Sequence, residues 1–525
     1  MNNEKPLSFI LFLGVTAAVC GALVMVVEVL GSRVIGPFFG VSLFVWTGLI
    51  TVTLVALSVG YAMGGILSDK KNTPDYLYGI VFLSGVLVML IPVLRKPVLM
   101  TFQSYGLRMG SFLSSAVLFG PSLMLLGCIS PYVVRLAAKE VRNLGRLVGI
   151  FYSISTMGSF IGTIMTGYVL VAYFDVYKIF LTTGLLLVLI SCVYLVFFRK
   201  KVASAAALVL LMAAAWQYQE PLVDKVLQSG TRVTEIYRKE TFYGAIKVVD
   251  YSFGTQHTRE LMLDGQIQGG IDLNSNESVY EFAYFLELLP YLTHPEGKSC
   301  LVIGLGAGIV PLWYEKNGIR TDVVEINPEV VRVARDFFKF GVSGNVYVQD
   351  ARYFLENTEN SYDFMILDVF NGDTTPAHLL SREAVHALKE HLNPKGILAI
   401  NLIGSLGGEN YMTASVVKTL QSSFQHVKIY PLFSPDENEG VGNIAILAHD
   451  ASFAGISPDR LRSFTIHPMV SERVVKYFGR EFRFPAKTAA VMLTDRYNPI
   501  DFYDAQLKEK TRKDILKFTD QEILL

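Results

Sequence analysis

The sequence predicts a multi-span α-helical membrane domain, followed by a soluble α/β domain that opens with a small antiparallel β subdomain. Long apolar runs make up most of the first part of the chain. Stretches rich in β-branched and aromatic residues come next, and apolar strand-like runs then alternate with amphipathic segments. We therefore expect a transmembrane domain at 1–217, a β subdomain at 218–295 and a ligand-binding α/β domain at 296–525.

The charge balance and the cysteine and histidine content indicate which kinds of ligand the protein is not expected to bind. The chain has 525 residues, with 46 Lys and Arg balanced by 46 Asp and Glu. Basic residues are in excess up to residue 217 and acidic residues are in excess after it. The balanced total gives no electrostatic reason to expect nucleic-acid binding. The 4 cysteines and 8 histidines show no metal-ligand spacing, so we expect no metal and no paired cysteines.

Six apolar runs are each near or above the roughly 20 residues that a membrane-spanning helix needs. A seventh run, 202–216, is shorter and rich in alanine. These runs predict a multi-pass protein of the cell membrane. The six longer runs are 8–30, 41–67, 76–94, 110–134, 147–172 and 177–198.

The sidedness of the soluble part depends on the seventh run. Lys and Arg are more frequent in the loops that face the cytoplasm if the N-terminus is inside, so the positive-inside rule favours that orientation. If 202–216 spans the membrane, the soluble part lies outside the cytoplasm; if it lies flat or re-enters, the soluble part stays inside. Two features leave a transport role open: Glu28 late in the first run, and GGILSDKK (64–71), which resembles a loop of major facilitator transporters.

The soluble part begins with two stretches, 231–251 and 257–270, that predict a small antiparallel sheet. After Cys300, strand-like and helical patterns alternate, which predicts a parallel sheet covered on both faces. Ligands of such sheets bind beyond the carboxyl ends of the strands. The residues expected at those ends are Gly304, Gly306, Gly308, Glu325, Asp350 and Asp368.

The glycine spacing in VIGLGAGIV (302–310) favours an adenosyl-sulfonium ligand. A dinucleotide fingerprint needs a third glycine at position 309, which is isoleucine. Glu325 is placed to accept hydrogen bonds from both ribose hydroxyls, and Asp350 from the adenine amino group. Acidic residues often end strands for solubility alone, but their succession at neighbouring strand ends indicates a binding site.

Residues from about 231 to 430 resemble the spermidine synthase family of aminopropyltransferases, which use decarboxylated S-adenosylmethionine. The combination of a membrane part, this domain and a late TDRYNP also resembles a group of membrane-fused spermidine synthase-like proteins. The resemblance implies a Rossmann-like fold of the class I methyltransferase and spermidine synthase type, and a homodimer. The segments that carry it are FYGAIKV with Tyr243, LDGQIQ with Asp264 and Gln268, NESVY with Glu277 and Tyr280, GLGAG, VEIN, QDA and LDVFNGDTTPAHLL with Asp368.

The chain also departs from that family. Ala307 stands in the glycine loop where spermidine synthases usually have an aspartate that holds the donor's ammonium group. Asn371 stands where the second aspartate of their D-S-S-D run anchors the amine, and Asp373 follows two residues later. The adenosyl-binding residues are thus kept, while several amine-binding residues are not.

The resemblance implies attack of an amine on a carbon next to a sulfonium. Asp368 is the expected base, with Tyr243 or Tyr280 relaying the proton or orienting the amine. Gln268 is expected to close over the adenosyl group or the substrate, and Asp373 to replace the missing anchor. The residues assigned to the substrate site are Asp264, Glu277 and Asp373.

Three functions stay open at this point. The first is a membrane-bound aminopropyltransferase that uses decarboxylated S-adenosylmethionine as co-substrate, with no bound cofactor. The second is a transferase or lyase that uses S-adenosylmethionine itself, which Ala307 favours by removing a charge that would repel the methionine carboxylate. The third is a transporter or sensor that only binds a nucleoside or polyamine. We expect an amine substrate and the lipid bilayer as partners, and rank a cytoplasmic soluble part slightly higher because the donor is made there.

Overall fold

The structure, a computed structural model, describes residues 6–40, 42–138, 144–201, 222–370, 375–408, 410–434, 440–454, 456, 458–503 and 505–524. Its contacts divide the chain into two units. The first comprises Met1–Pro221, Lys239–Gly244 and Thr519–Leu525, and the second Leu222–Arg238 and Ala245–Phe518. The predicted seventh run, 202–216, lies outside the described residues. The domain boundaries at 217 and 295 stay predictions.

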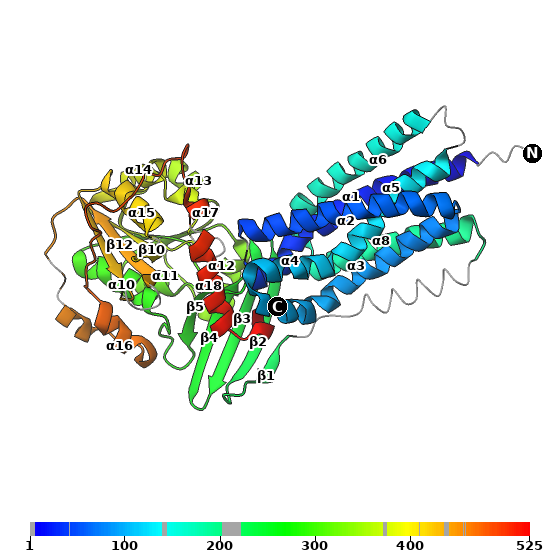
Figure 1. Cartoon of the computed structure of the whole chain (residues 1–525). Coiled ribbons are helices and arrows are strands. Elements are labelled where there is room, and N and C mark those ends of the chain that lie inside the picture. The colour runs from blue at the N-terminus through cyan, green and yellow to red at the C-terminus, as the bar shows by residue number, and fades with distance from the viewer. Residues whose placement is uncertain are drawn as a thin grey trace, which may run out of the picture. The chain divides into compact units, whose positions relative to one another are not determined.

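The first unit is helical, as predicted (Figure 1). The described part of the chain contains 6 helical segments that are long and apolar enough to cross a membrane: Leu7–Phe39, Leu43–Lys70, Pro74–Leu118, Gly120–Ala137, Leu144–Tyr173 and Val176–Phe197. These segments are formed by α1 (Leu7–Phe39), α2 (Leu43–Lys70), α3 (Pro74–Phe102), α4 (Gly106–Leu118), α5 (Gly120–Ala137), α6 (Leu144–Ile164), α7 (Val171–Tyr173) and α8 (Val176–Phe197). The first unit also contains a short helix near the end of the chain, α19 (Gln521–Leu524).

The predicted span 110–134 does not form one helix. It is divided between α4, which ends at Leu118, and α5, which begins at Gly120. Pro121 lies in the first turn of α5, where its missing N–H and fixed φ suit a helix start and disfavour continuation from α4. The apolar run shows how hydrophobic the segment is, but the proline decides where the helix breaks.

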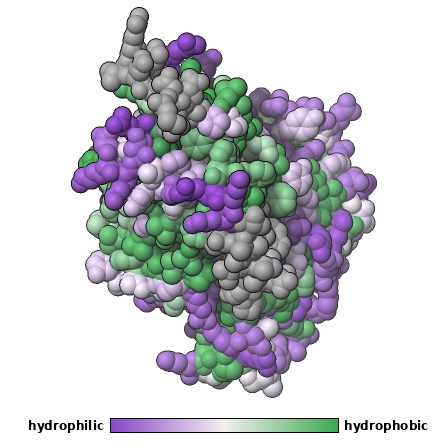
Figure 2. All heavy atoms as spheres, turned by 90° about the vertical axis from the view of Figure 1, so that its right-hand side faces the viewer, coloured by the Kyte–Doolittle hydropathy of each residue, from purple (hydrophilic) through white to green (hydrophobic). Residues whose placement is uncertain are grey.

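Helices of the first unit pack closely through small residues and expose apolar side chains elsewhere. A Cβ added to Gly158 of α6 would lie 2.0 Å from the carbonyl oxygen of Ala18 in α1, so only glycine permits this backbone approach. Leu54, Phe160 and Tyr168 are 63%, 61% and 76% exposed. Figure 2 shows broad hydrophobic patches on the face that it presents. Exposed apolar helices of this kind are typical of proteins that associate with a membrane.

The second unit contains a five-stranded sheet in the order β1-β2-β3-β4-β5, which matches the predicted antiparallel sheet. Alternating buried and exposed residues along β2 are typical of a sheet with one face on a core. The strands are β1 (Asp224–Val226), β2 (Arg232–Thr241), β3 (Gly244–Phe253), β4 (Gln256–Leu263) and β5 (Gln266–Asp272).

A seven-stranded sheet follows, with the order β11-β12-β10-β9-β6-β7-β8. β6 to β10 pair in parallel as predicted, but β12 pairs antiparallel with both β10 and β11, so the sheet is mixed. The strands are β6 (Ser299–Ile303), β7 (Arg320–Glu325), β8 (Val346–Val348), β9 (Tyr362–Leu367), β10 (Leu392–Ser405), β11 (His426–Pro431) and β12 (Val441–His449).

Helices cover both faces of this sheet (Figure 1). Val302 and Ile366 face one hydrophobic cluster, while Ile303 and Leu367 face the other, because successive strand residues point to opposite faces. The helices are α10 (Glu281–Thr293), α11 (Ile309–Lys316), α12 (Pro328–Phe338), α13 (Ala351–Asn357), α14 (Arg382–Glu390), α15 (Tyr411–Gln421), α16 (Pro468–Tyr477), α17 (Ile500–Tyr503) and α18 (Ala505–Phe518). The sheet order reverses between β6 and β9, which is where open α/β sheets bind ligands.

Candidate active site

The glycine turn joins β6 to α11 at this reversal point. Gly304 has φ 91°, and a Cβ at this position would lie 2.1 Å from the carbonyl oxygen of Asp368. Gly308 has φ 75° and immediately precedes α11. Both conformations and the close approach need glycine. The turn therefore brings the ends of β6 and β9 together.

The small sheet meets the glycine turn through β5. A Cβ on Gly306 would lie 2.7 Å from the carbonyl oxygen of Gln268, and one on Gly269 would lie 3.1 Å from the Cβ of Ala307. The β4–β5 register shifts here, which leaves Gln268 as the extra residue of a β-bulge. Bulges re-aim side chains and are frequent beside active sites. The backbone carbonyl of Gln268 thus lies against the turn, and the expected role of its side chain stays a prediction.

Glu325 ends β7 and supports the glycine turn. Its Oε2 accepts a hydrogen bond from the backbone N–H of Leu305 at 3.0 Å, and its Oε1 accepts one from Asn327 at 2.8 Å. Burial raises the pKa of Glu325, and these backbone hydrogen bonds oppose the rise. Each oxygen retains a lone pair for a second donor, such as a ribose hydroxyl.

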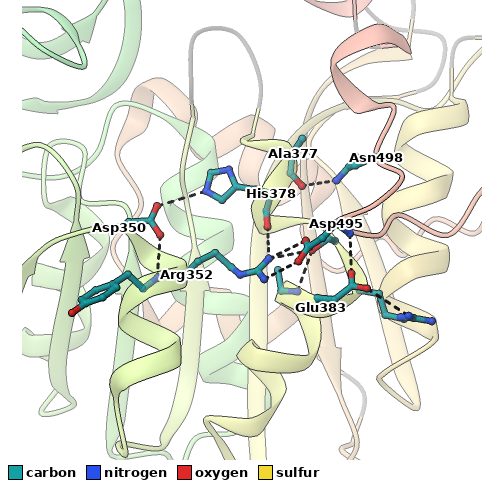
Figure 3. A network of polar contacts seen from close by, with 11 residues as sticks. Asp350, Arg352, Ala377, His378, Glu383, Asp495 and Asn498 are labelled. Atoms are coloured by element: carbon teal, nitrogen blue, oxygen red, sulfur yellow. Dashed lines mark hydrogen bonds and ion pairs between the residues drawn. The ribbon is translucent and has the colours of Figure 1, made fainter. Parts of the chain in front are cut away.

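Asp350 follows β8, the strand next to β7, and caps α13. Its Oδ1 accepts the backbone N–H of Tyr353 at 3.1 Å, and its Oδ2 lies 3.7 Å from Nε2 of His378. Figure 3 shows both contacts. The side chain is 42% exposed, so it is accessible to an adenine amino group while it caps the helix.

Asp368 follows β9 and is held by a pair of asparagine side chains, one on β10 and one on β12. Its Oδ1 accepts a hydrogen bond from Nδ2 of Asn401 at 2.8 Å, and Oδ1 of Asn401 accepts one from Nδ2 of Asn443 at 3.0 Å. Burial raises the pKa of Asp368 to about 6, against the effect of the Asn401 hydrogen bond. A carboxylate with such a pKa is suited to accept a proton near neutral pH.

Tyr280 lies just before α10 and contacts a second, half-buried carboxylate. Its hydroxyl donates to Oε1 of Glu260, on β4, at 2.5 Å. Tyr251 of β3 forms a further side-chain hydrogen bond with Glu260. Burial raises the pKa of Glu260 to about 7, and the two tyrosine hydrogen bonds lower it. Glu260 is not among the site residues that the sequence predicts.

The other expected site residues occupy different environments. Asp264 has φ 49° in the β4–β5 turn, where its Oδ1 accepts the backbone N–H of Ala245 at 2.8 Å. Glu277 is half-buried, and burial raises its pKa. Tyr243 is 40% exposed and belongs to the first unit. Asp373 lies outside the described residues.

The late TDRYNP segment contacts the beginnings of α13 and α14. Asp495 accepts hydrogen bonds from Arg352 of α13 at 3.1 and 3.0 Å and from Oγ of Ser381, the N-cap of α14, at 2.5 Å (Figure 3). Its backbone N–H donates to Glu383 at 3.0 Å. Asp495 therefore joins α13, whose cap is Asp350, to the start of α14. No group of three or more metal-ligating side chains occurs among the residues that the structure describes.

Comparisons with known proteins agree with this geometry. Residues 282–453 match the family model described as the spermine/spermidine synthase domain. The N-terminal histidine N-methyltransferase of Emericella nidulans is 33% identical over 150 residues, which are 27% of this chain and 26% of that protein. The polyamine aminopropyltransferase of Vibrio vulnificus is 36% identical over 126 residues, which are 22% of this chain and 41% of that protein.

The chain thus spans less than half of the length of either of these relatives. Among solved structures, a probable spermidine synthase from Corynebacterium glutamicum is 21% identical with a TM-score of 0.37, covering 42% of this chain and 81% of that one. The family model thus matches a segment of the α/β part, and residues 282–453 are similar to the spermine/spermidine synthase domain.

Proposed function

We propose that this chain is a membrane-associated enzyme that transfers an aminopropyl group from decarboxylated S-adenosylmethionine to an amine and releases methylthioadenosine. The observation that carries the proposal is the position of Asp368. Burial raises the pKa of its carboxyl group, and its backbone carbonyl lies against Gly304 at the point where the sheet order reverses. A half-buried base with a raised pKa beside a glycine turn suits a transfer reaction that must remove one proton.

The donor site follows from the neighbouring strand ends. The backbone of Gly304, Gly306 and Gly308 would pack against the adenosyl group, and Glu325 would accept the ribose hydroxyls. Asp350 would accept the adenine amino group, and Gln268 would close over the donor from the small sheet. All these groups belong to the second unit, so their arrangement does not depend on the helical unit.

The proposed reaction releases one proton and therefore needs one base to accept it. The amine nitrogen attacks the aminopropyl carbon next to sulfur and forms a C–N bond, while the C–S bond breaks and its electron pair returns to sulfur. The sulfonium becomes a neutral thioether. The proton that the attacking nitrogen loses goes to Asp368, and Tyr280 would orient the amine. Holding both reactants in line supplies much of the rate. Asp264, Glu277 and Asp373 remain the proposed substrate-site residues.

A product assay on the purified full chain tests the proposal. We expect methylthioadenosine only when decarboxylated S-adenosylmethionine and an amine are both supplied. Asp368→Asn, which keeps the size of the side chain but cannot accept the proton, should lower the rate at least a hundredfold. Asp336→Asn is the matched control, because Asp336 is an exposed carboxylate on α12. Absence of any nucleoside product with a panel of amines would refute aminopropyl transfer to these amines.

A second candidate uses S-adenosylmethionine itself. It is favoured by Ala307, which is buried in the glycine turn and places no carboxylate near the position of the methionine carboxylate. In the same assay, methylthioadenosine from the intact donor would indicate a lyase or aminocarboxypropyl transfer. S-adenosylhomocysteine would indicate methyl transfer. Binding of methylthioadenosine without turnover would instead support the binding or transport alternative.

The proposal includes multi-pass membrane insertion, a cytoplasmic second unit and a homodimer. The apolar helices support membrane association. Labelling of Lys395→Cys with a membrane-impermeant maleimide tests the sidedness, because Lys395 is exposed and the four native cysteines are buried. Labelling only after permeabilisation is the expected result. Labelling of intact cells would place the second unit outside.

A further inference from the structure

The late TDRYNP segment, residues 494–499, has no part in the proposed reaction. It lies outside 282–453, the residues that match the family model. Two hydrogen bonds, of 3.1 and 3.0 Å, join the carboxylate of Asp495 to the guanidinium of Arg352 in α13 (Figure 3). The N-cap of α13 is Asp350, the residue proposed to bind the adenine amino group. The segment is therefore tied to the element that carries this part of the donor site.

The same network holds the backbone of His378, whose ring faces Asp350 (Figure 3). Nη1 of Arg352 donates a hydrogen bond to the carbonyl oxygen of His378 at 3.0 Å. Nδ2 of Asn498, in the late segment, donates to the carbonyl oxygen of the preceding residue, Ala377, at 2.6 Å. Two neighbouring carbonyl groups are thus fixed, one through Arg352 and one directly. The late segment therefore helps to set where His378 lies relative to Asp350.

His378 and Asp350 present a hydrogen-bond donor beside an acceptor. Nε2 of His378 lies 3.7 Å from Oδ2 of Asp350, and the two side chains are 56% and 42% exposed. Oδ1 of Asp350 already accepts the backbone N–H of Tyr353, so Oδ2 is the oxygen that a ligand would use. The nearby carboxylate favours the imidazole tautomer that carries its proton on Nε2. Both groups are accessible to the same ligand.

Adenine offers the complementary pair of groups. Its exocyclic amino group donates hydrogen bonds, and the ring nitrogens on either side of it, N1 and N7, accept them. A carboxylate oxygen alone would recognise only the amino group. A carboxylate oxygen beside an N–H also recognises a ring nitrogen, and two matched hydrogen bonds discriminate between bases better than one.

We propose that His378 is a specificity-determining residue for the nucleoside. Its Nε2–H donates to a ring nitrogen of adenine while Oδ2 of Asp350 accepts from the amino group. Asp495 and Asn498 are positioning residues that hold His378 in place. The assignment rests on the proposed function, which provides the adenosyl ligand. It concerns recognition of the adenine alone, so it does not depend on the acceptor or on which group is transferred.

Binding of methylthioadenosine and of its 7-deaza and 1-deaza analogues to the purified full chain tests the assignment. Each analogue replaces one ring nitrogen by C–H and keeps the amino group. One of the two analogues should bind the wild type about three- to tenfold more weakly than methylthioadenosine, the range for one neutral hydrogen bond. His378→Ala should bind methylthioadenosine more weakly by about the same factor, and should no longer distinguish it from that analogue.

Two further histidine variants serve as controls. His378→Gln retains an N–H donor at the end of the side chain, so it should keep part of the discrimination between methylthioadenosine and the analogue. His386→Ala removes a histidine that is 68% exposed on α14 and lies near Glu390 of the same helix. It should bind all three nucleosides as the wild type does.

Asp495→Asn separates positioning from a general structural role. The substitution weakens the hold on Arg352 and should therefore reduce the discrimination between methylthioadenosine and the analogue. In the His378→Ala background it should cause no further change in that discrimination. A purely structural role would instead lower the affinity for all three nucleosides by the same factor and leave their ratios unchanged.

The outcomes distinguish this assignment from the proposed function. Equal discrimination in the wild type and His378→Ala, or equal affinity of the wild type for all three nucleosides, would overturn the assignment even where the transfer reaction is observed. Discrimination that is lost in His378→Ala, in a chain that makes no nucleoside product, would support the assignment and refute the transfer reaction. A chain that binds none of the three nucleosides would overturn both.

Discussion

Asn401 donates a hydrogen bond from Nδ2 to Oδ1 of Asp368 at 2.8 Å, and Asn443 in turn donates to Asn401 at 3.0 Å. The two amides lie on adjacent antiparallel strands, β10 and β12, where residues 401 and 443 are close in the register. Oδ2 of Asp368 has no partner among the described residues. The strands thus fix one carboxylate oxygen and leave the other available to a substrate.

The acid limb of the pH–rate profile should depend on Asn401. Its hydrogen bond lowers the pKa of Asp368, which burial raises to about 6. Asp368 must be ionised to accept a proton, so kcat/KM should fall as pH decreases through about 6. Asn401→Leu removes the donor and should move this limb to higher pH. A limb that stays in place in Asn401→Leu, with the fold intact by thermal melting, would contradict this role.

Asp368→Asn should stabilise the protein while it abolishes activity. The pKa of Asp368 is higher in the folded state than the ordinary value near 3.9, so the folded state holds the proton more tightly. The stability of the wild type therefore falls as pH rises from about 4 to about 6. The asparagine variant lacks this loss and should gain about 3 kcal/mol in free energy of unfolding at pH 7. Denaturant unfolding at pH 5 and pH 7 measures it. A difference independent of pH would mean that the carboxylate is not buried as described.

Gly304→Ala should disrupt donor binding for a steric reason. The added Cβ would lie 2.1 Å from the carbonyl oxygen of Asp368, in addition to the strain of φ 91°. Gly318→Ala is the matched control, because Gly318 has φ 76° but no atom within 4 Å of the added Cβ. Both variants should lose about 1 kcal/mol from backbone strain. Only Gly304→Ala should weaken methylthioadenosine binding more than tenfold, as equilibrium binding would show. Equal binding in both variants would argue against the turn as the donor site.

The Arg352–Asp495 pair should contribute measurably to stability. Two hydrogen bonds join the guanidinium to the carboxylate, and the side chains are 20% and 43% exposed (Figure 3). Partial exposure limits the interaction, so a double-mutant cycle with Arg352→Gln and Asp495→Asn should give a coupling of about 1 kcal/mol. Unfolding of the four proteins in denaturant provides the measurement. Additive effects of the two substitutions would show that the pair is only a surface contact.

Sequence patterns predicted the strands that build the site better than they predicted its polar support. The residues of β6 and β9 form short continuous apolar runs, which are typical of strands buried on both faces. The antiparallel β12 has no local signal for its direction, because pairing direction depends on which strand is its neighbour in space. The break between α4 and α5 was likewise hidden within one apolar run, although Pro121 marks it.

The sequence by itself determined the division of the chain into an apolar part and a more polar part. It also determined the glycine turn and the acidic residues at the strand ends. Each of these is a local pattern of residue types. Only the tertiary structure decided that Asn401 reaches Asp368, that Asn443 reaches Asn401, and that Glu260 meets Tyr280 over Gly270. A single polar residue within an apolar strand carries no local sign of its partner. Its partner lies on another strand, and strand pairing is set by the packing of the whole sheet rather than by neighbours in the chain.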